Sequence, residues 1–237
     1  MRPIKSASTI MLVREQEGEL EVLLLKRNKA LAFAGGLWVF PGGKIEAFEE
    51  EQGEDDLAAA KLAAVRETKE EANIDIDPEN LFFFRHWTTT VKEPRRYATY
   101  FFFGAVENAA SEVKVDDSEI KQHLWIHPQK ALDKVRTREL AMMPPTIMSL
   151  QLIRKCQSVA EAQELILQEK PIFILPVLQP KNGKMFCMYE GDAGYSTGEA
   201  DTVGARHRLV LDMSKGEFVF EYSDCDEVRA VNGGMHL

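Results

Sequence analysis

The chain has 237 residues, enough for one large domain or for one domain with a small annex. Hydrophobic residues make up 45% and charged residues 28%, which excludes a disordered chain, a collagen and a disulfide scaffold. With 29 Lys and Arg against 38 Asp and Glu, the net charge is −9, so neither nucleic acid nor an anionic membrane is expected as a partner. Phosphate binding would have to be local, through metal ions or a few arginines.

The cysteines and the hydropathy pattern bear on the compartment. Cys156, Cys187 and Cys225 lie far apart and form no CxxC pair, which favours a reducing compartment and no structural zinc. The longest apolar stretches, residues 100–106 and 171–178, are well short of the ~20 residues of a membrane helix. The N-terminus lacks the apolar core of a signal peptide. We therefore expect a cytoplasmic protein.

The predicted elements mix strands and helices without a steady repeat. Strands are expected at 8–13 and 19–25, joined by a hairpin connection at 14–18 and followed by a Gly- and aromatic-rich loop at 32–43. A helix is expected at 55–73, because its composition favours helix and acidic residues crowd its first turn. Then come strands at 81–90, 97–106 and 124–127, helices at 129–135, 145–156 and 159–168, β-structure at 172–177, and short strands around a Gly-rich loop at 191–204. This order favours an α+β or sandwich architecture over a Rossmann fold.

Three glutamates share one face of the helix predicted at 55–73. At about 100° per residue, Glu67, Glu70 and Glu71 fall nearly opposite the small and apolar residues. Like charges at these spacings repel, so the cluster costs stability unless a cation binds there. Hard divalent cations such as Mg²⁺ accept carboxylate oxygens and keep waters and phosphates as further ligands. The alternative is a solvated acidic helix face.

The segment that contains this helix resembles the Nudix box, GX5EX7REUXEEXGU, in which U is a bulky aliphatic residue. The first part of the motif is matched by Gly43 and Glu49. The second part is matched by Arg66, Glu67, Glu70, Glu71 and Ile74.

The sequence departs from that motif in three places. Sixteen residues, where the family has seven, separate Glu49 from the second part, and residues 50–54 are expected to form an exposed acidic loop. Thr68 replaces an aliphatic residue, and Asn73 replaces a glycine but tolerates the left-handed conformation expected at a helix C-terminus. The insertion leaves two sources for a helix cap or an outer carboxylate, Glu49 or the pair Asp55 and Asp56.

The resemblance implies a Nudix-type α/β/α sandwich with a mixed β-sheet in residues 1–170, and residues 171–237 are expected to form a C-terminal β-rich extension packed on it. It also implies an enzyme that hydrolyses nucleoside diphosphates linked to another moiety, using Mg²⁺ or Mn²⁺. Such ions neutralise the diphosphate and lower the pKa of a bound water.

Site residues are implied by the same motif match. The metal ligands would be Glu67, Glu70, Glu71 and the Gly43 carbonyl. The catalytic set would be Glu67, Arg66 and Glu70, with Arg66 orienting the glutamates by ion pairing. Glu67 is a candidate general base, and the alternative base is Glu119, a carboxylate just before a strand.

A second resemblance lies upstream. Residues 23–27, Gly36 and the FPGG run at 40–43 are similar to the coenzyme A signature of a Nudix branch, LLTxR[SA]x3Rx3Gx3FPGG. Ala32 stands where the second arginine belongs, which removes a charge-assisted contact suited to phosphate. Together with the long insertion, this is similar to the branch that includes mammalian peroxisomal CoA diphosphatases. CoA or acyl-CoA is then the leading substrate, and ADP-ribose or NADH is the alternative substrate. A different alternative is that the protein is a nucleotide sensor without catalytic activity.

The candidate substrate-binding residues are Arg27, Lys44, Arg95 and Arg96. Arg95 and Arg96 stand just before a strand, and a guanidinium binds phosphate bidentately. The alternative is a pair of turn arginines that face solvent. The expected partner is a small-molecule nucleotide diphosphate derivative, with a homodimer as an option.

Overall fold

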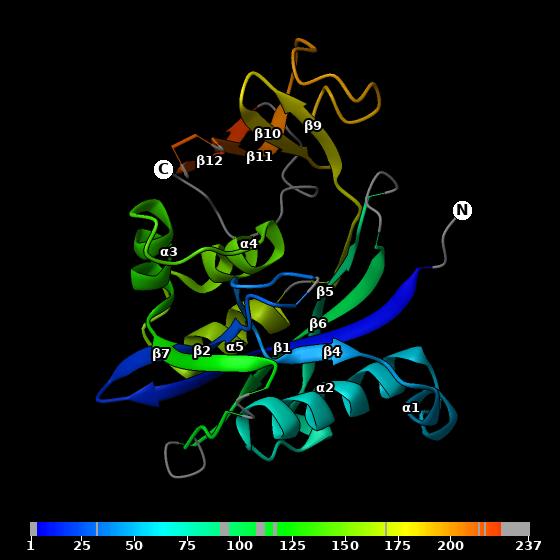
Figure 1. Cartoon of the computed structure of the whole chain (residues 1–237), viewed down its shortest axis with the longest axis vertical. Coiled ribbons are helices and arrows are strands. Elements are labelled where there is room, and N and C mark those ends of the chain that lie inside the picture. Colours follow the sequence, from blue (N-terminus) through cyan, green and yellow to red (C-terminus); the bar gives the residue numbers. More distant parts are fainter. Residues whose placement is uncertain are drawn as a thin grey trace.

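A mixed β-sheet forms the centre of the protein, seen in a computed structural model that describes residues 4–31, 33–90, 95–107, 112–115, 118–168, 170–212, 214–215 and 217–223 (Figure 1). Its eight strands are β1 (Lys5–Gln16), β2 (Glu19–Arg27), β3 (Trp38–Val39), β4 (Gly42–Lys44), β5 (Phe82–Thr88), β6 (Tyr97–Ala105), β7 (Ile120–Ile126) and β8 (Ile172–Ile174). Their order is β3-β2-β1-β6-β5-β8, with β4 also paired to β1 and β7 to β2. The β1–β6 and β5–β8 pairs are parallel, and the other pairs of this sheet are antiparallel.

Apolar runs that are buried on both faces explain the two long N-terminal strands. In β1, Ile10 and Leu12 face one core cluster while Met11 and Val13 face the other. The hairpin connection is shorter than predicted, because both strands extend to a two-residue turn at 17–18 whose residues have positive φ.

Helices cover both faces of this sheet, which confirms the predicted α/β/α sandwich. On one face lie α1 (Ala47–Gln52) and α2 (Asp56–Ala72), and on the other lie α3 (Pro128–Arg136), α4 (Pro144–Ile153) and α5 (Val159–Leu167) (Figure 1). A short 3₁₀ helix, η1 (Pro78–Asn80), precedes β5. Of the helices in the described ranges, none has the length and apolar character needed to cross a membrane.

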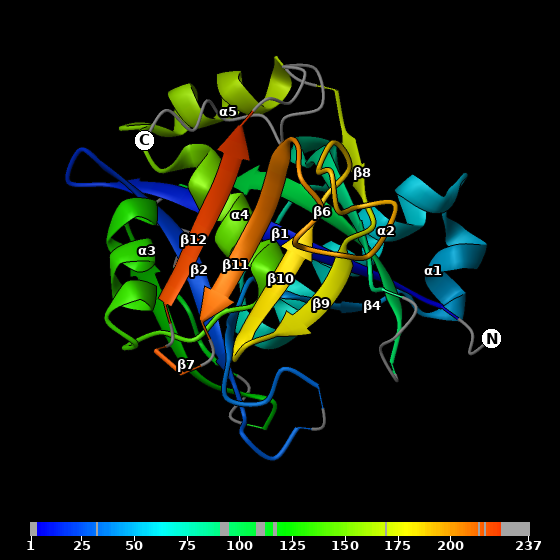
Figure 2. The same cartoon turned by 90° about the horizontal axis from the view of Figure 1, so that it is seen from above.

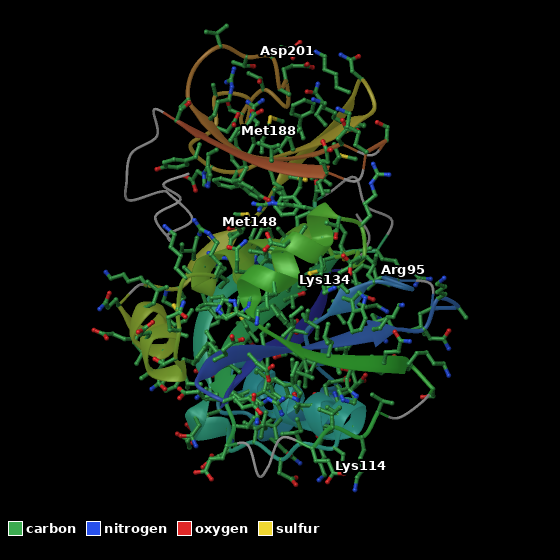
Figure 3. The ribbon with its side chains drawn as sticks, turned by 90° about the vertical axis from the view of Figure 1, so that its left-hand side faces the viewer. Arg95, Lys114, Lys134, Met148, Met188 and Asp201 are labelled. Atoms are coloured by element: carbon green, nitrogen blue, oxygen red, sulfur yellow. The ribbon has the colours of Figure 1, made fainter. Side chains whose placement is uncertain are left out.

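A second sheet, made by the C-terminal residues, lies over α4 (Figures 1 and 2). It is antiparallel and consists of β9 (Val177–Lys181), β10 (Lys184–Met188), β11 (Arg206–Asp212) and β12 (Glu217–Ser223). Residues 146–153 of α4 are all buried, because this helix packs between the two sheets; Figure 3 labels Met148 in that layer. The predicted β-rich tail is thus observed, although β8 belongs to the central sheet.

The Gly-rich loop at 191–204 is bound to its own sheet. Arg208 Nη2 lies 2.6 Å from Asp192 Oδ1, with both side chains almost fully buried, and Arg208 Nη1 also donates to the Ala200 carbonyl. The loop therefore folds back onto the strands that it connects.

Three local predictions were wrong. The segment expected as a loop at 32–43 contains the short strand β3 and the first residues of β4. Residues 50–52, expected in an exposed loop, form the last turn of α1, although their side chains are exposed. The strand expected at 124–127 begins four residues earlier, at Ile120, because β7 pairs with the whole second half of β2.

Candidate active site

Helix α2 presents the predicted acidic face from well-capped ends. Asp55 Oδ1 accepts a hydrogen bond from the Ala58 N–H at 2.8 Å, so Asp55 is the N-cap. Asn73 ends the helix in the left-handed conformation, with φ 58°, as predicted. Thr68 is buried and donates its hydroxyl to the Ala64 carbonyl, which satisfies a polar group where an aliphatic residue is usual in the motif.

Arg66 connects the acidic face of α2 to α1 and β4 through hydrogen bonds. Its Nη1 donates to Glu67 Oε1 at 2.9 Å and to Glu70 Oε2 at 3.0 Å, and its Nη2 donates to the Lys44 carbonyl at 3.0 Å. Its Nε donates to Glu49 Oε1 at 2.8 Å. Burial works against the charge, but Glu49 and Glu67 hold the pKa of Arg66 above its usual value.

Glu49 is the residue that anchors Arg66. Its side chain is 1% exposed, and besides Arg66 it accepts a hydrogen bond from the Glu46 N–H at 2.8 Å, closing a capping box at the start of α1. Both alternatives for the insertion are therefore realised in different roles: Asp55 caps α2, and Glu49 pairs with Arg66.

Glu71 is the most buried of the three glutamates. Its Oε2 accepts the Gly42 N–H at 2.9 Å, and its Oε1 lies 3.6 Å from Arg27 Nη1. Burial raises the pKa of Glu71 to about 8; the hydrogen bond from Gly42 opposes this shift, and the charge of Glu67 adds to it. Burial likewise raises the pKa of Glu67.

Gly43 is required by the close approach of Glu67. A Cβ atom at position 43 would lie 2.2 Å from Glu67 Oε1, so only glycine lets the carboxylate lie against β4. Because β4 is hydrogen-bonded to β1, the backbone that Glu67 touches is fixed by the sheet.

Arg27 pairs with a further carboxylate, that of Glu119, beside the acidic face of α2. Its Nη2 lies 3.3 Å from Glu119 Oε2, and its Nε is buried with no hydrogen-bond partner among the residues that the structure describes. The pairing of β2 with β7 puts the start of β7, and with it Glu119, beside the end of β2. Glu119 adds to the negative potential that acts on Glu67 and Glu71.

The predicted substrate-binding residues fall in two places. Arg27 lies beside the glutamates, and Lys44 contributes its carbonyl to Arg66. Arg96 is buried and donates from Nε to the Thr89 carbonyl at 3.3 Å. Arg95 is exposed, and Figure 3 shows it and α2 on opposite sides of the central sheet. Ala32, the position of the absent arginine, lies outside the described residues.

The oxygen atoms gathered here are of the kind that bind a hard divalent cation, although their side chains do not all point at one position. Among the side chains that the structure places, no three His, Cys, Asp or Glu converge as a ready metal cluster, and Arg66 and Arg27 pair with the glutamates. Glutamate and carbonyl oxygens are the ligands that Mg²⁺ and Mn²⁺ accept. A cation beside Glu67 and Glu71 would offset the mutual repulsion that adds to the raised pKa of Glu71.

Comparison with known proteins agrees with this arrangement. The sequence profile described as "NUDIX domain" matches residues 4–144. The "Putative nudix hydrolase 7" of Caenorhabditis elegans is 22% identical over 226 residues, covering 81% of this chain and 74% of that protein. The "Peroxisomal coenzyme A diphosphatase 1" of Saccharomyces cerevisiae is 40% identical over 76 residues, which are 32% of this chain and 20% of that protein.

A solved structure shows the same fold. The crystal structure of a NUDIX hydrolase from Alicyclobacillus acidocaldarius superposes with a TM-score of 0.62 at 22% identity, covering 69% of this chain and 97% of that chain. The α/β/α sandwich with its mixed sheet is therefore shared with that protein.

Proposed function

The chain belongs to the NUDIX domain family, and we propose that this Nudix hydrolase cleaves the diphosphate linkage of a nucleotide derivative with the help of Mg²⁺ or Mn²⁺. The observation that carries the proposal is the acidic face of α2, on which Glu71 is buried against the Gly42 N–H while Glu67 lies against Gly43. Such a face costs stability, so it is better explained by a cation site than by a solvated surface.

Glu67, Glu70, Glu71 and the Gly43 carbonyl would hold the cation. When bound, it would neutralise the diphosphate and lower the pKa of a water. Arg66 orients Glu67 and Glu70, and the buried Glu49 holds Arg66 in place. Two carboxylates can take the proton of the attacking water, Glu67 on the helix or Glu119 at the start of β7.

Arg27 is the first candidate for the phosphate contact, because its buried Nε–H has no protein partner among the described residues. Lys44, exposed at the end of β4, would add positive charge beside the acidic face, whereas Arg95 would act from the other side of the central sheet. Arg96 would fix the start of β6. A small-molecule nucleotide derivative is thus the partner, rather than nucleic acid or a membrane. A cytoplasmic location, a homodimer and the division into residues 1–170 and 171–237 stay predictions.

Coenzyme A or acyl-CoA is the leading substrate. It is supported by Arg27, Gly36 and the FPGG run, and by the partial match to the yeast peroxisomal coenzyme A diphosphatase. ADP-ribose or NADH is the second candidate, because Ala32 replaces the second arginine of the CoA signature. A nucleotide sensor without turnover is a third reading, which the complete REtkEE segment disfavours.

A screen of nucleotide conjugates, with products identified by mass spectrometry, tests the proposal. CoA, ADP-ribose and NADH are incubated with the protein, with and without Mg²⁺. We expect metal-dependent cleavage of at least one, reduced by ~100-fold or more in Glu70→Gln and in Glu71→Gln. Glu50→Gln, a change on the exposed side of α1, is the matched control. Binding without turnover would favour the sensor.

A further inference from the structure

Strands β2 and β7, which lie side by side in Figure 1, pair irregularly where they reach the acidic site. Lys26 is opposite Gln122, but the next residue of β2, Arg27, is opposite Ile120. This step is a β-bulge, in which two residues of β7 oppose one residue of β2. Because side chains alternate along a strand, the bulge puts Ile120 on the α2 face of the sheet, where it is fully buried. The residues that precede Ile120 therefore lie one position nearer to Arg27 than a regular ladder would place them.

Asn28 holds the residues just before the bulged strand. Its backbone N–H donates to the Glu119 carbonyl at 2.7 Å, and its side-chain Nδ2 donates to the Ser118 carbonyl at 3.0 Å. Its Oδ1 accepts the Ala30 N–H at 3.1 Å, so these two side-chain contacts fit only one orientation of the amide. The coenzyme A signature has Ser or Ala at this position, which are shorter side chains without an amide donor. The contact is therefore a feature of this chain.

The segment held by Asn28 presents the Glu119 carboxylate to the acidic site. Glu119 Oε2 lies 3.3 Å from Arg27 Nη2, and Glu71 Oε1 lies 3.6 Å from Arg27 Nη1, so one guanidinium spans the two carboxylates. The negative charge of Glu119 also acts on Glu67 and Glu71. The Glu119 side chain is 58% exposed, and an exposed side chain loses conformational freedom when it is ordered beside a ligand. A fixed backbone lowers that cost.

We infer that Asn28 is a positioning residue, which holds the Glu119 carboxylate beside the cation site on α2. This inference rests on the proposed function, and it adds the contact that ties a carboxylate from outside the helix to that site. Asn28 acts through the backbone carbonyls of residues 118 and 119. Its effect on a bound cation must therefore disappear when the side chain at position 119 carries no charge.

A double-mutant cycle on Mn²⁺ affinity tests the inference. Electron paramagnetic resonance measures free Mn²⁺ in the presence of the wild type, Asn28→Ser, Glu119→Gln and the double variant. The serine hydroxyl can still accept the Ala30 N–H, but the amide donor is lost. We expect each single variant to raise the Kd for Mn²⁺ about tenfold, and the double variant to match Glu119→Gln within about twofold. Gln122→Ala, which removes an exposed contact with Lys26 on the regular side of the bulge, is the control and should bind Mn²⁺ like the wild type.

The outcomes separate the two proposals. If Asn28→Ser weakens Mn²⁺ binding equally with and without the Glu119 carboxylate, Asn28 does not act through Glu119 and the inference is refuted. It is refuted as well if either single variant binds Mn²⁺ like the wild type while Glu71→Gln binds it more weakly, a result that leaves the proposed function standing. If the wild-type protein binds no Mn²⁺, the proposed cation site itself is wrong, and the inference falls with it.

Discussion

Replacing Glu71 by glutamine should remove a pH dependence from the stability of the metal-free protein. Burial raises the pKa of Glu71 to about 8 in the folded chain, from an ordinary value of 4.5. A carboxyl group with a raised folded-state pKa favours folding while it is protonated. Its contribution is complete below pH 4.5 and is lost as the pH rises through 8. Glutamine imitates the protonated form at every pH.

The size of the effect follows from the difference between the two pKa values. A shift of about 3.5 units at 1.36 kcal/mol per unit sets an upper limit of about 5 kcal/mol, lost between pH 4.5 and pH 8. Glu67, whose pKa is also raised by burial, titrates in the same neighbourhood and shares part of the loss. The glutamine variant should therefore keep a smaller pH dependence.

Urea unfolding in EDTA at pH 5.5 and pH 8.5 measures this. The wild-type free energy of unfolding should fall by several kcal/mol between the two, and that of Glu71→Gln by less than half as much. Glu79→Gln, an exposed change of equal charge on η1, should follow the wild type. Adding Mg²⁺ at pH 8.5 should restore stability to the wild type but much less to the variant. Equal losses in wild type and Glu71→Gln would refute the reasoning.

Three further outcomes are expected. Gly43→Ala should weaken Mg²⁺ binding about tenfold or more in calorimetry, because its Cβ would displace Glu67; unchanged affinity would contradict the close approach. Glu49→Gln should lower the free energy of unfolding by about 2–3 kcal/mol, since it removes the buried anion of Arg66, whereas Glu50→Gln on the exposed side of α1 should stay within about 0.5 kcal/mol. If CoA is cleaved, steady-state kinetics should show that kcat/KM for CoA exceeds kcat/KM for dephospho-CoA by less than about tenfold. One good charge-assisted contact to the 3′-phosphate accounts for ~10–100-fold, and the signature's second arginine is absent. A hundredfold preference would reveal an unidentified cation that binds the 3′-phosphate.

Local signals were strong enough to predict α2 and the long strands. The helix has a regular acidic face and cap residues at both ends, Asp55 and Asn73, so its limits followed from the sequence almost to the residue. Helix α1 has six residues and too few apolar side chains to show a period. Its N-cap is Glu46, which is not among the preferred N-cap residues, so the capping box that Glu46 forms with Glu49 left no recognisable signal in the sequence.

Contacts between distant segments could not be predicted in the same way. The association of Arg27 with Glu71 and Glu119 depends on how β2 pairs with β7 and where α2 crosses β4, and one sequence carries no record of such pairings. Arg95 and Arg96 show a second limit of prediction from the sequence, which is the direction in which a side chain points. Successive side chains at the start of a strand point in opposite directions, so one is buried and the other exposed, and composition does not say which.

The position of α4 between two sheets makes the C-terminal residues part of the stability of the whole protein. A helix with one face in water tolerates polar substitutions there, but residues 146–153 have no such face. Its outer side is covered by strands that come after position 176, and one continuous core cluster runs from β1 through α4 to β11. Cutting the chain near residue 170 would expose an apolar helix surface, and the shortened protein would aggregate rather than fold. The two sheets should therefore unfold in a single cooperative transition, even though their strands never pair.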